Sequence, residues 1–376
     1  MKEWASCKKI LCIRPDNMGD LIMSAPAMRA LKESFGCTIT LLTSSMAAGI
    51  VPFLPEIDEL IQCNVPWVKG PGIASPDGFY SLISELQIRQ FDAAVIFTVY
   101  SQNSLPSAML AYLAGIPKCL AYCRENPYNL LTHWVPDQEP YRFVQHQVQR
   151  DLHLVETVGA FTQNKKLHLQ LRKNLWPEVT NRLSSIGVDV QKPWLIAHAG
   201  VSERKREYPG GLWIETGRKI VNELDYQVIL TGSILEKQKL QLLQSGIGKN
   251  AFNAAGLLSL EEFMTLIKRA PLVLSVNTST IHMAAALETP VIVLYALSNP
   301  QHSPWMATGK VLIFDIPKQL RSQNEIVRYV QENLHPQMVP MVPPDEILYT
   351  VKDVLFGNGD HFIPDMIPLQ TAEQVF

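Results

Sequence analysis

The sequence predicts an α/β protein built from two Rossmann-like domains that face each other across a cleft. Short apolar runs alternate with helical patterns in each half of the chain, and the alternation stops in between. Strands that alternate with helices form parallel βαβ units. The chain has 376 residues, which is about two domains on a prior of ~150 residues each. We expect ligands in the cleft between the two domains.

The first half alternates short apolar runs, which we expect to be strands, with helical patterns. The expected strands span 10–13, 38–42, 59–62, 93–97 and 118–121, and the expected helices span 21–34, 81–89 and 104–114. Residues 124–150 are polar, aromatic and proline-bearing, so the alternation of strands and helices ends there. A helical pattern at 148–159 follows and leads toward a domain boundary.

The alternation resumes after residues 177–187. The expected strands span 194–197, 227–230, 252–253, 272–275 and 291–294, and the expected helices span 212–223, 260–268 and 281–287, with one more from Leu235. After Gly309 we expect a loop and a last helix at 345–355. These patterns predict an N-terminal domain at 1–175, a C-terminal domain at 176–345, and a helix with a tail at 346–376.

The composition is that of an ordinary globular protein, with 47% hydrophobic residues, 18% charged residues and a net charge of −2. This charge gives no bulk attraction to nucleic acid, so we expect no nucleic-acid partner. No apolar run approaches the ~18 residues of a membrane-spanning helix, and the first residues lack the apolar core of a signal peptide, so we expect a cytoplasmic protein. All six cysteines lie in the first 123 residues without a Cys-x-x-Cys pair, which indicates buried reduced thiols and no metal site.

The stretch from Arg14 to Leu31 carries the first candidate site, because a strand enters a tight turn, Met18-Gly19-Asp20, that opens a helix. This order places loop backbone and a carboxylate at the carboxyl end of a parallel strand, where open α/β sheets bind ligands. Gly19 tolerates backbone angles that other residues resist. Asp20 either caps the helix, which the segment alone favours, or serves at the mouth of the cleft.

A second candidate site runs from Asn277 through Thr278 and Ser279 to His282, between an apolar strand and a helix rich in small residues. The hydroxyls and the free N–H groups at the helix start can hold phosphate oxygens, and the helix dipole favours negative charge there. His282 can donate to the same phosphates. The alternative is an ordinary core helix capped by serine and threonine.

A third segment, after the first strand of the second domain, contains Arg204, Lys205 and Arg206 in a row. Such a run is usually solvated surface, but here it stands at the carboxyl end of a predicted strand, where it could clamp a diphosphate. After the next strand, Gly232 offers a turn and Glu236 a carboxylate that could accept hydrogen bonds from ribose hydroxyls. Taken alone, Glu236 is better explained as a plain first-turn helix residue.

Together these segments resemble glycosyltransferase family 9, the ADP-heptose:lipopolysaccharide heptosyltransferases, over roughly residues 8–305. The matches to the family's patterns are Arg14, Met18-Gly19-Asp20 and Pro26, then Lys205 with Tyr208-Pro209, then Gly232 with Glu236, and finally the segment from Asn277 to Ala285. Two positions depart from the family pattern. Asn277 stands where the family usually has aspartate, and Ser279 where it has glycine, so the resemblance does not carry over the contacts to the donor sugar or phosphate at these two positions.

The resemblance implies the GT-B fold and an inverting glycosyl transfer that needs no metal and no cofactor. It implies that Asp20 is the catalytic base, in an acceptor-side loop with Arg14, Met18 and Gly19, and that the second domain binds the nucleotide sugar. The implied donor is ADP-heptose. The implied acceptor is the lipopolysaccharide core or a related glycolipid, which would bring the first domain into peripheral contact with the inner membrane.

Three alternatives to this function remain open. The chain could be a family member that uses a different nucleotide sugar, or a catalytically inactive nucleotide-sugar-binding protein, as the changes at Asn277 and Ser279 suggest. A dinucleotide-dependent oxidoreductase also has paired α/β units, but Gly-x-Gly-x-x-Gly follows the first strand of neither domain.

Overall fold

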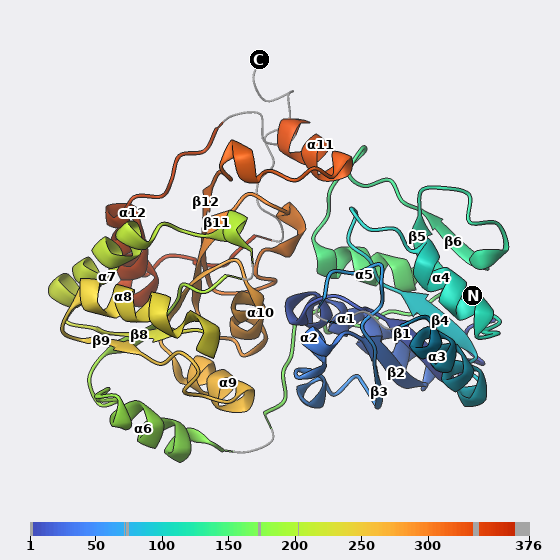
Figure 1. The fold of residues 1–376 in the computed structure, drawn as a ribbon, viewed down its shortest axis with the longest axis horizontal. Coiled ribbons are helices and arrows are strands. Elements are labelled where there is room, and N and C mark those ends of the chain that lie inside the picture. Colours follow the sequence, from blue (N-terminus) through green and yellow to red (C-terminus); the bar gives the residue numbers. More distant parts are fainter. Residues whose placement is uncertain are drawn as a thin grey trace. The chain divides into compact units, whose positions relative to one another are not determined.

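The structure is a computed structural model that describes residues 3–70, 72, 75–171, 174–201, 203–333 and 338–364. The chain divides into two compact units, Met1–Gln170 and Leu171–Phe376. Each unit is built on one six-stranded parallel sheet with helices packed on it (Figure 1). The predicted α/β class with two Rossmann-like units is therefore confirmed. Most of the predicted tail, residues 365–376, lies outside the described residues.

The sheet of the first unit has the strand order β3-β2-β1-β4-β5-β6. Its strands are β1 (Lys9–Ile13), β2 (Thr38–Thr43), β3 (Glu59–Gln62), β4 (Ala93–Ile96), β5 (Cys119–Cys123) and β6 (His133–Pro136). Its α-helices are α1 (Met18–Phe35), α2 (Ser45–Ala48), α3 (Pro76–Arg89), α4 (Leu105–Leu113) and α5 (Gln147–Glu156).

The sheet of the second unit has the strand order β12-β11-β10-β7-β8-β9. Its strands are β7 (Trp194–His198), β8 (Gln227–Thr231), β9 (Ala251–Asn253), β10 (Val273–Val276), β11 (Val291–Ala296) and β12 (Gly309–Phe314). Its α-helices are α6 (Trp176–Ser185), α7 (Gly210–Leu224), α8 (Lys237–Ile247), α9 (Leu260–Arg269), α10 (Ser279–Ala286), α11 (Glu325–Asn333) and α12 (Pro344–Phe356).

Both sheets reverse their strand order beside the first strand of the unit. In the first unit β1 pairs with β2 on one side and with β4 on the other. In the second unit β7 pairs in the same way with β8 and β10. Successive connections leave such a point in opposite directions, and open α/β sheets bind ligands there, outside the carboxyl ends of the strands. Each unit therefore has one preferred ligand position, after β1 and β4 or after β7 and β10.

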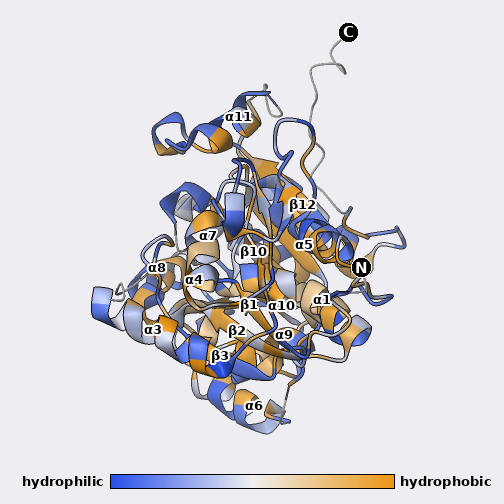
Figure 2. Cartoon of the chain, turned by 90° about the vertical axis from the view of Figure 1, so that its right-hand side faces the viewer, coloured by the Kyte–Doolittle hydropathy of each residue, from blue (hydrophilic) through white to orange (hydrophobic). Residues whose placement is uncertain are grey.

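The cores lie on the two faces of each sheet, because the central strands are mostly apolar and almost fully buried. Four of the five β1 residues and all four β10 residues are buried, as expected for parallel strands covered on both sides. Figure 2 shows the strands largely in hydrophobic colours and the outward turns of helices such as α3 and α6 in hydrophilic ones. The cysteines are free thiols, as predicted, and all except the half-buried Cys63 are buried.

Three elements correct the sequence-based expectations. We expected no strand within 124–150 and only a loop between Gly309 and the last helix, but β6, β12 and α11 lie there. Both strands are at the edge of a sheet. An edge strand is paired on one side only and can contain proline, such as Pro136 in β6, so it lacks the continuous apolar run of a central strand.

Candidate functional site

Asp20 lies in the first turn of α1, beyond the carboxyl end of β1. Its Oδ2 accepts a hydrogen bond from the backbone N–H of Asn17 at 3.3 Å, so Asp20 caps the helix. Its Oδ1 lies 3.4 Å from Nη2 of Arg14. The Asp20 side chain remains 13% exposed, which leaves the carboxylate within reach of a ligand.

Arg14 binds a second carboxylate beside the first. The Arg14 side chain is fully buried, and its Nη1 lies 3.3 Å from Oδ2 of Asp16. Burial lowers the pKa of Arg14, but the charges of Asp16, Asp20 and Asp151 outweigh burial and raise it. Burial raises the pKa of Asp16 against the opposing charge of Arg14. The start of α1 is thus a compact group of two carboxylates around one permanent cation.

Met18 and Gly19 form the start of α1 itself. Met18 is half-buried and Gly19 is buried, and both have helical backbone conformation. The expected tight turn with unusual backbone angles at Gly19 is therefore wrong, because the helix already begins at Met18. Gly19, which has no side chain, instead lies buried in the first turn of α1, next to Asp20.

A buried polar network lies below this group and ties α1 to α5. Oδ2 of Asp151 accepts from the Ser24 hydroxyl at 2.6 Å, and its Oδ1 accepts from Nε2 of Gln147 at 2.8 Å. Burial raises the pKa of Asp151 to about 6. Arg150 is fully buried and forms ion pairs with Asp137 and Glu139 at 2.9 and 2.7 Å. These hydrogen bonds and ion pairs hold α5 against α1 and against the segment that contains Asp137 and Glu139.

In the second unit, the predicted cationic residues form a short 3-10 turn, Arg204–Arg206, after β7. Nη1 of Arg206 donates to the backbone carbonyl of Asn277 at 3.4 Å. Lys205 and Arg206 both lie near Oε2 of Glu203, at 3.1 and 3.5 Å. The structure therefore brings Arg206 to the start of α10, with Lys205 held by the same carboxylate, whereas the Arg204 side chain is exposed.

The start of α10 has polar groups that the described part of the chain does not pair. Thr278 is the N-cap residue, but its side chain makes no capping hydrogen bond. Oδ1 of Asn277, Oγ1 of Thr278 and Nε of Arg206 are buried and have no hydrogen-bond partner among the described residues. Ser279 is half-buried, and His282 is buried one turn into the helix. Because buried unpaired polar atoms are rare in proteins, these atoms indicate a place for a polar ligand.

Glu236 lies against the backbone at the end of β7. Its Oε2 accepts from the N–H and the hydroxyl of Ser233 at 2.7 and 2.9 Å, so Glu236 caps its own turn. A Cβ on Gly200 would lie 2.2 Å from Oε1 of Glu236, and a Cβ on Gly232 would lie 3.0 Å from its Oε2. The two glycines therefore leave the room that the carboxylate occupies.

His198, the last residue of β7, lies close to this carboxylate. Its Nδ1 shares a hydrogen bond with Oγ1 of Thr231 at 2.9 Å. Burial lowers the pKa of His198 to about 4, although the charge of Glu236 acts in the opposite direction. His198 is therefore a neutral imidazole at physiological pH.

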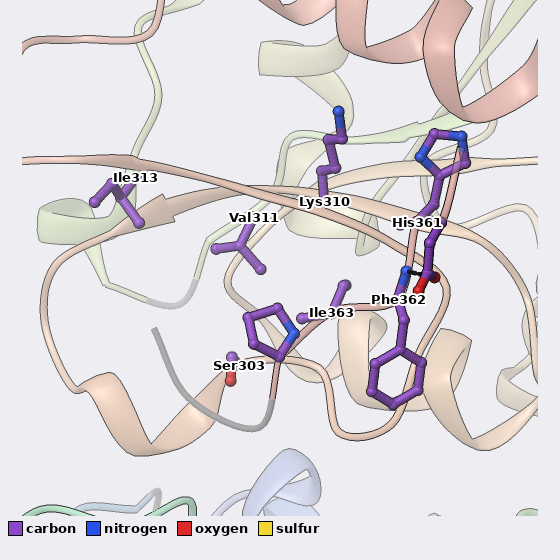
Figure 3. Close-up of a pocket in the computed structure, with 10 residues that line it drawn as sticks. Ser303, Lys310, Val311, Ile313, His361, Phe362 and Ile363 are labelled. Carbon is purple, nitrogen blue, oxygen red and sulfur yellow. Dashed lines mark hydrogen bonds between the residues drawn. The ribbon is translucent and has the colours of Figure 1, made fainter. Parts of the chain in front are cut away.

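The predicted residues of the second unit converge on one edge of its sheet, since their loops follow β7, β8 and β10. A mostly apolar pocket of about 360 Å³ lies elsewhere in this unit, between β12 and residues 360–364 (Figure 3). Figure 3 shows Val311, Phe362 and Ile363 around it, and none of the predicted residues lines it.

The sequence did not identify several residues of the site around Asp20 and of the site in the second unit. Asp16 stands in the same segment as Asp20, so a second carboxylate before the helix was a visible signal. His198 directly follows the predicted strand 194–197 and Gly200 comes two residues later, where ligand-binding residues gather. Gln102, whose Nε2 donates to Oδ1 of Asp16, and Asp151 carried no local signal, because they reach the site only through strand order and helix packing.

The described residues contain no group of three or more His, Cys, Asp or Glu side chains placed to bind a metal ion. No helix in the described ranges has the length and apolar character needed to cross a bilayer.

Comparison with known proteins gives consistent matches. The family model described as Glycosyltransferase family 9 (heptosyltransferase) matches residues 79–328. Lipopolysaccharide heptosyltransferase 2 of Salmonella typhimurium is 27% identical over 311 residues, which cover 79% of this chain and 85% of that protein. Lipopolysaccharide heptosyltransferase 2 of Escherichia coli K12 is 24% identical over 310 residues, again 79% and 85%.

Two solved structures share the fold. The glycosyl transferase family 9 protein from Veillonella parvula matches with a TM-score of 0.72 at 16% identity, over 93% of this chain and 97% of that one. The E. coli ADP-heptose lps heptosyltransferase II matches with a TM-score of 0.68 at 21% identity, over 92% and 98%. At these identities the structural matches establish the GT-B fold.

Proposed function

The chain belongs to glycosyltransferase family 9, and from this membership we propose that it transfers heptose from ADP-heptose to a lipopolysaccharide-core acceptor, with inversion and without a metal ion. Its general activity, glycosyl transfer, follows from the family. The donor, the acceptor and the stereochemistry are the proposal. The names of its relatives support the donor and the acceptor, since one is called an ADP-heptose lps heptosyltransferase and another a lipopolysaccharide heptosyltransferase.

The contact between Arg206 and Asn277 is the observation that carries the donor site. It joins a cationic turn after β7 to the start of a helix after β10. Arg206 and Lys205 would bind the diphosphate, and the free N–H groups of α10 would add the attraction of a helix N-terminus. The unpaired oxygens of Asn277 and Thr278 would find partners in the bound donor. Ser279 and His282 lie on the same first turn and line this anion site.

The adenosine ribose would lie near Glu236, whose carboxylate accepts hydrogen bonds from sugar hydroxyls. Gly200 and Gly232 give the carboxylate its place. Arg204, on the exposed side of the cationic turn, would contribute long-range attraction to the diphosphate. Together these residues do electrostatically what a divalent cation does in other transferases, because they offset the negative charge that builds up on the leaving diphosphate.

The chemical step is one displacement. The acceptor oxygen attacks the anomeric carbon of heptose, the bond from that carbon to the diphosphate oxygen breaks, and ADP leaves with the electron pair. Asp20 takes the proton of the acceptor hydroxyl. One displacement without a covalent enzyme intermediate inverts the anomeric configuration. Arg14 orients Asp20. Met18 and Gly19 lie beside Asp20 in the first turn of α1.

The acceptor would be presented by a glycolipid, so the protein would meet the cytoplasmic face of the inner membrane peripherally. No cofactor takes part in this reaction, because the donor carries the activated sugar. No nucleic acid is involved. The altered Asn277 and Ser279 favour one second candidate, a family member that binds a nucleotide sugar but does not transfer it.

The test is to incubate the purified protein with ADP-heptose and deacylated lipopolysaccharide-core oligosaccharide, and to follow ADP release and product mass. We expect ADP release that depends on the acceptor, an inverted linkage by NMR, and full activity in excess EDTA. Activity that EDTA abolishes and magnesium restores contradicts the metal-independent mechanism. In parallel, thermal stabilisation by ADP, UDP, GDP, CMP and NAD identifies the nucleotide, since a ligand at about 100 times its Kd adds ~2.7 kcal/mol.

A further inference from the structure

A pocket in the first unit has no role in the mechanism above. It has a volume of about 220 Å³ and lies at the carboxyl ends of β1 and β4. Pro15 reaches it from the loop after β1, and Thr98 and Ser101 reach it from the segment after β4. Because the strand order reverses between β1 and β4, the pocket lies where open α/β sheets bind their ligands.

The side chains that line the pocket carry no charge. They include the indole of Trp67, the hydroxyl of Ser101 and the amides of Gln102 and Asn103. A phosphate or carboxylate ligand would need cationic partners. An aromatic ring beside neutral hydroxyl and amide groups suits a sugar instead, whose C–H face packs on the ring while its hydroxyls exchange hydrogen bonds.

The size of the pocket points the same way. Ligands of drug size occupy pockets of about 300–1,000 Å³. This pocket, at about 220 Å³, accommodates one sugar ring and is too small for a nucleotide.

Trp67 is held in place before any ligand arrives. Its Nε1 donates to the hydroxyl of Ser107 at 3.1 Å. Its ring meets Phe79 edge to face, with centroids 5.8 Å apart at 88°. The indole is half-buried. A side chain that is already fixed loses little conformational entropy when a ligand stacks on it.

A chain of polar contacts joins the pocket wall to Asp20. Nε2 of Gln102 donates to Oδ1 of Asp16 at 2.5 Å. Oδ2 of Asp16 lies 3.3 Å from Arg14, and Arg14 lies 3.4 Å from Asp20. A ring seated against Gln102 is therefore connected to the proposed base through three side chains, those of Gln102, Asp16 and Arg14, all within the first unit.

We infer that this pocket binds one sugar ring of the acceptor, with Trp67 as the stacking surface. This inference rests on the proposed glycosyl transfer and adds to it the site at which the acceptor glycan is recognised. The ring in the pocket orients the attacking hydroxyl of the acceptor toward Asp20, and Asp16 and Gln102 are positioning residues that keep the pocket and the base in register.

The test uses the full chain with two variants and one control. Trp67→Ala removes the stacking surface. Ser101→Phe fills the pocket and leaves Trp67 in place, so it carries the test if the loss of the Phe79 contact destabilises Trp67→Ala. Trp134→Ala removes another tryptophan of the first unit, 44% exposed on β6 and outside the pocket.

Two readouts separate this inference from the proposed function. In steady-state kinetics, both pocket variants should raise the KM for deacylated lipopolysaccharide-core oligosaccharide about tenfold or more, with little change in kcat or in the KM for ADP-heptose. Without donor, saturation-transfer NMR should show the oligosaccharide bound to the wild type and to Trp134→Ala but not to the pocket variants. Binding of this kind supports the inference even if ADP-heptose is not turned over.

Three results would overturn the inference. The first is that oligosaccharide binding is absent in the wild type or unchanged in both pocket variants. The second is that both variants lower kcat and leave the acceptor KM unaltered. The third is a loss of ADP affinity in Trp67→Ala with no loss of oligosaccharide binding, which would assign the pocket to the donor.

Discussion

Arg14 and Asp20 form an ion pair at 3.4 Å in which the cation is fully buried and the carboxylate is partly exposed. The fully buried guanidinium of Arg14 is held in the protein interior, so it limits the movement of the paired Asp20 carboxylate. Asn17 restrains the other carboxylate oxygen through its backbone N–H. The proposed base thus keeps one orientation at the start of α1, which is a requirement for efficient proton transfer.

Replacement of this carboxylate should stop transfer but leave the nucleotide site intact. We expect Asp20→Asn to lower kcat by about 10²–10⁴, the usual contribution of a general base, and to leave the Kd for ADP nearly unchanged. Asparagine preserves an acceptor for the Asn17 N–H. The control is Asp77→Asn, which alters a first-turn carboxylate of α3 in the same unit and should leave kcat unaffected. Equal losses of transfer and ADP affinity in Asp20→Asn would contradict the assignment.

Removal of the cations after β7 should weaken binding of the nucleoside diphosphate. Charge-assisted hydrogen bonds contribute about 1.5–3 kcal/mol, so we expect Arg206→Ala and Lys205→Ala each to raise the Kd for ADP about tenfold or more in isothermal titration. Arg206→Ala should have the larger effect, because Arg206 donates to the backbone carbonyl of Asn277 at the start of α10. Lys249→Ala, at an exposed lysine of the same unit, is the control. An unchanged Kd in both variants would remove these residues from the donor site.

Gly200→Ala should displace Glu236, since the added methyl group would lie 2.2 Å from Oε1 of that carboxylate. If Glu236 binds the ribose, the wild type should prefer ADP to 2′-deoxy-ADP, and both Gly200→Ala and Glu236→Gln should lose that preference. The control is Gly211→Ala in α7, where an added Cβ meets nothing within 4 Å and stabilises the helix by about 0.5–1 kcal/mol. Preserved discrimination in Gly200→Ala would place the ribose elsewhere.

The buried His198 should make the second unit less stable in acid. Its pKa is about 4 in the folded protein and about 6.5 in an unfolded chain, so the unfolded state binds more protons between these values. The stability is complete above about pH 6.5 and declines as the pH falls toward 4, by at most about 3 kcal/mol.

Hydrogen exchange of the β7 amides at pH 7.5 and pH 4.5 measures this loss. The His198→Gln variant should lose less protection between the two pH values than the wild type. His168→Gln, at an exposed histidine, should behave like the wild type. The same pH dependence in wild type and His198→Gln would show that another group titrates.

The central strands of both sheets were predictable because they are buried on both faces and appear as continuous apolar runs, as in 10–13 and 291–294. The edge strands β6 and β12 were not, since one side of each is unpaired and their residues are half-exposed. The helix α11 was missed for a similar reason. Its sequence is polar apart from a narrow stripe, and it buries few residues.

The contacts of the candidate site also fall into those that the sequence could predict and those that it could not. Asp20 and Arg14 were predictable because six positions of sequence connect them. The contacts of Asp16 with Gln102, of Ser24 with Asp151 and of Arg206 with Asn277 join residues 86, 127 and 71 positions apart. They depend on which strands are neighbours and on how α5 packs on α1, and local patterns do not contain that information.

Both sheets reverse their strand order beside their first strand, so each unit has its own set of loops at the carboxyl ends of its strands. Loops at strand ends tolerate change far better than the buried strands that support them. With the donor assigned to one unit and the acceptor to the other, a descendant could acquire a new acceptor by mutation within residues 1–170 and retain its nucleotide sugar unaltered. The glycans made by such enzymes would then diversify by a change of the acceptor or of the donor, one at a time.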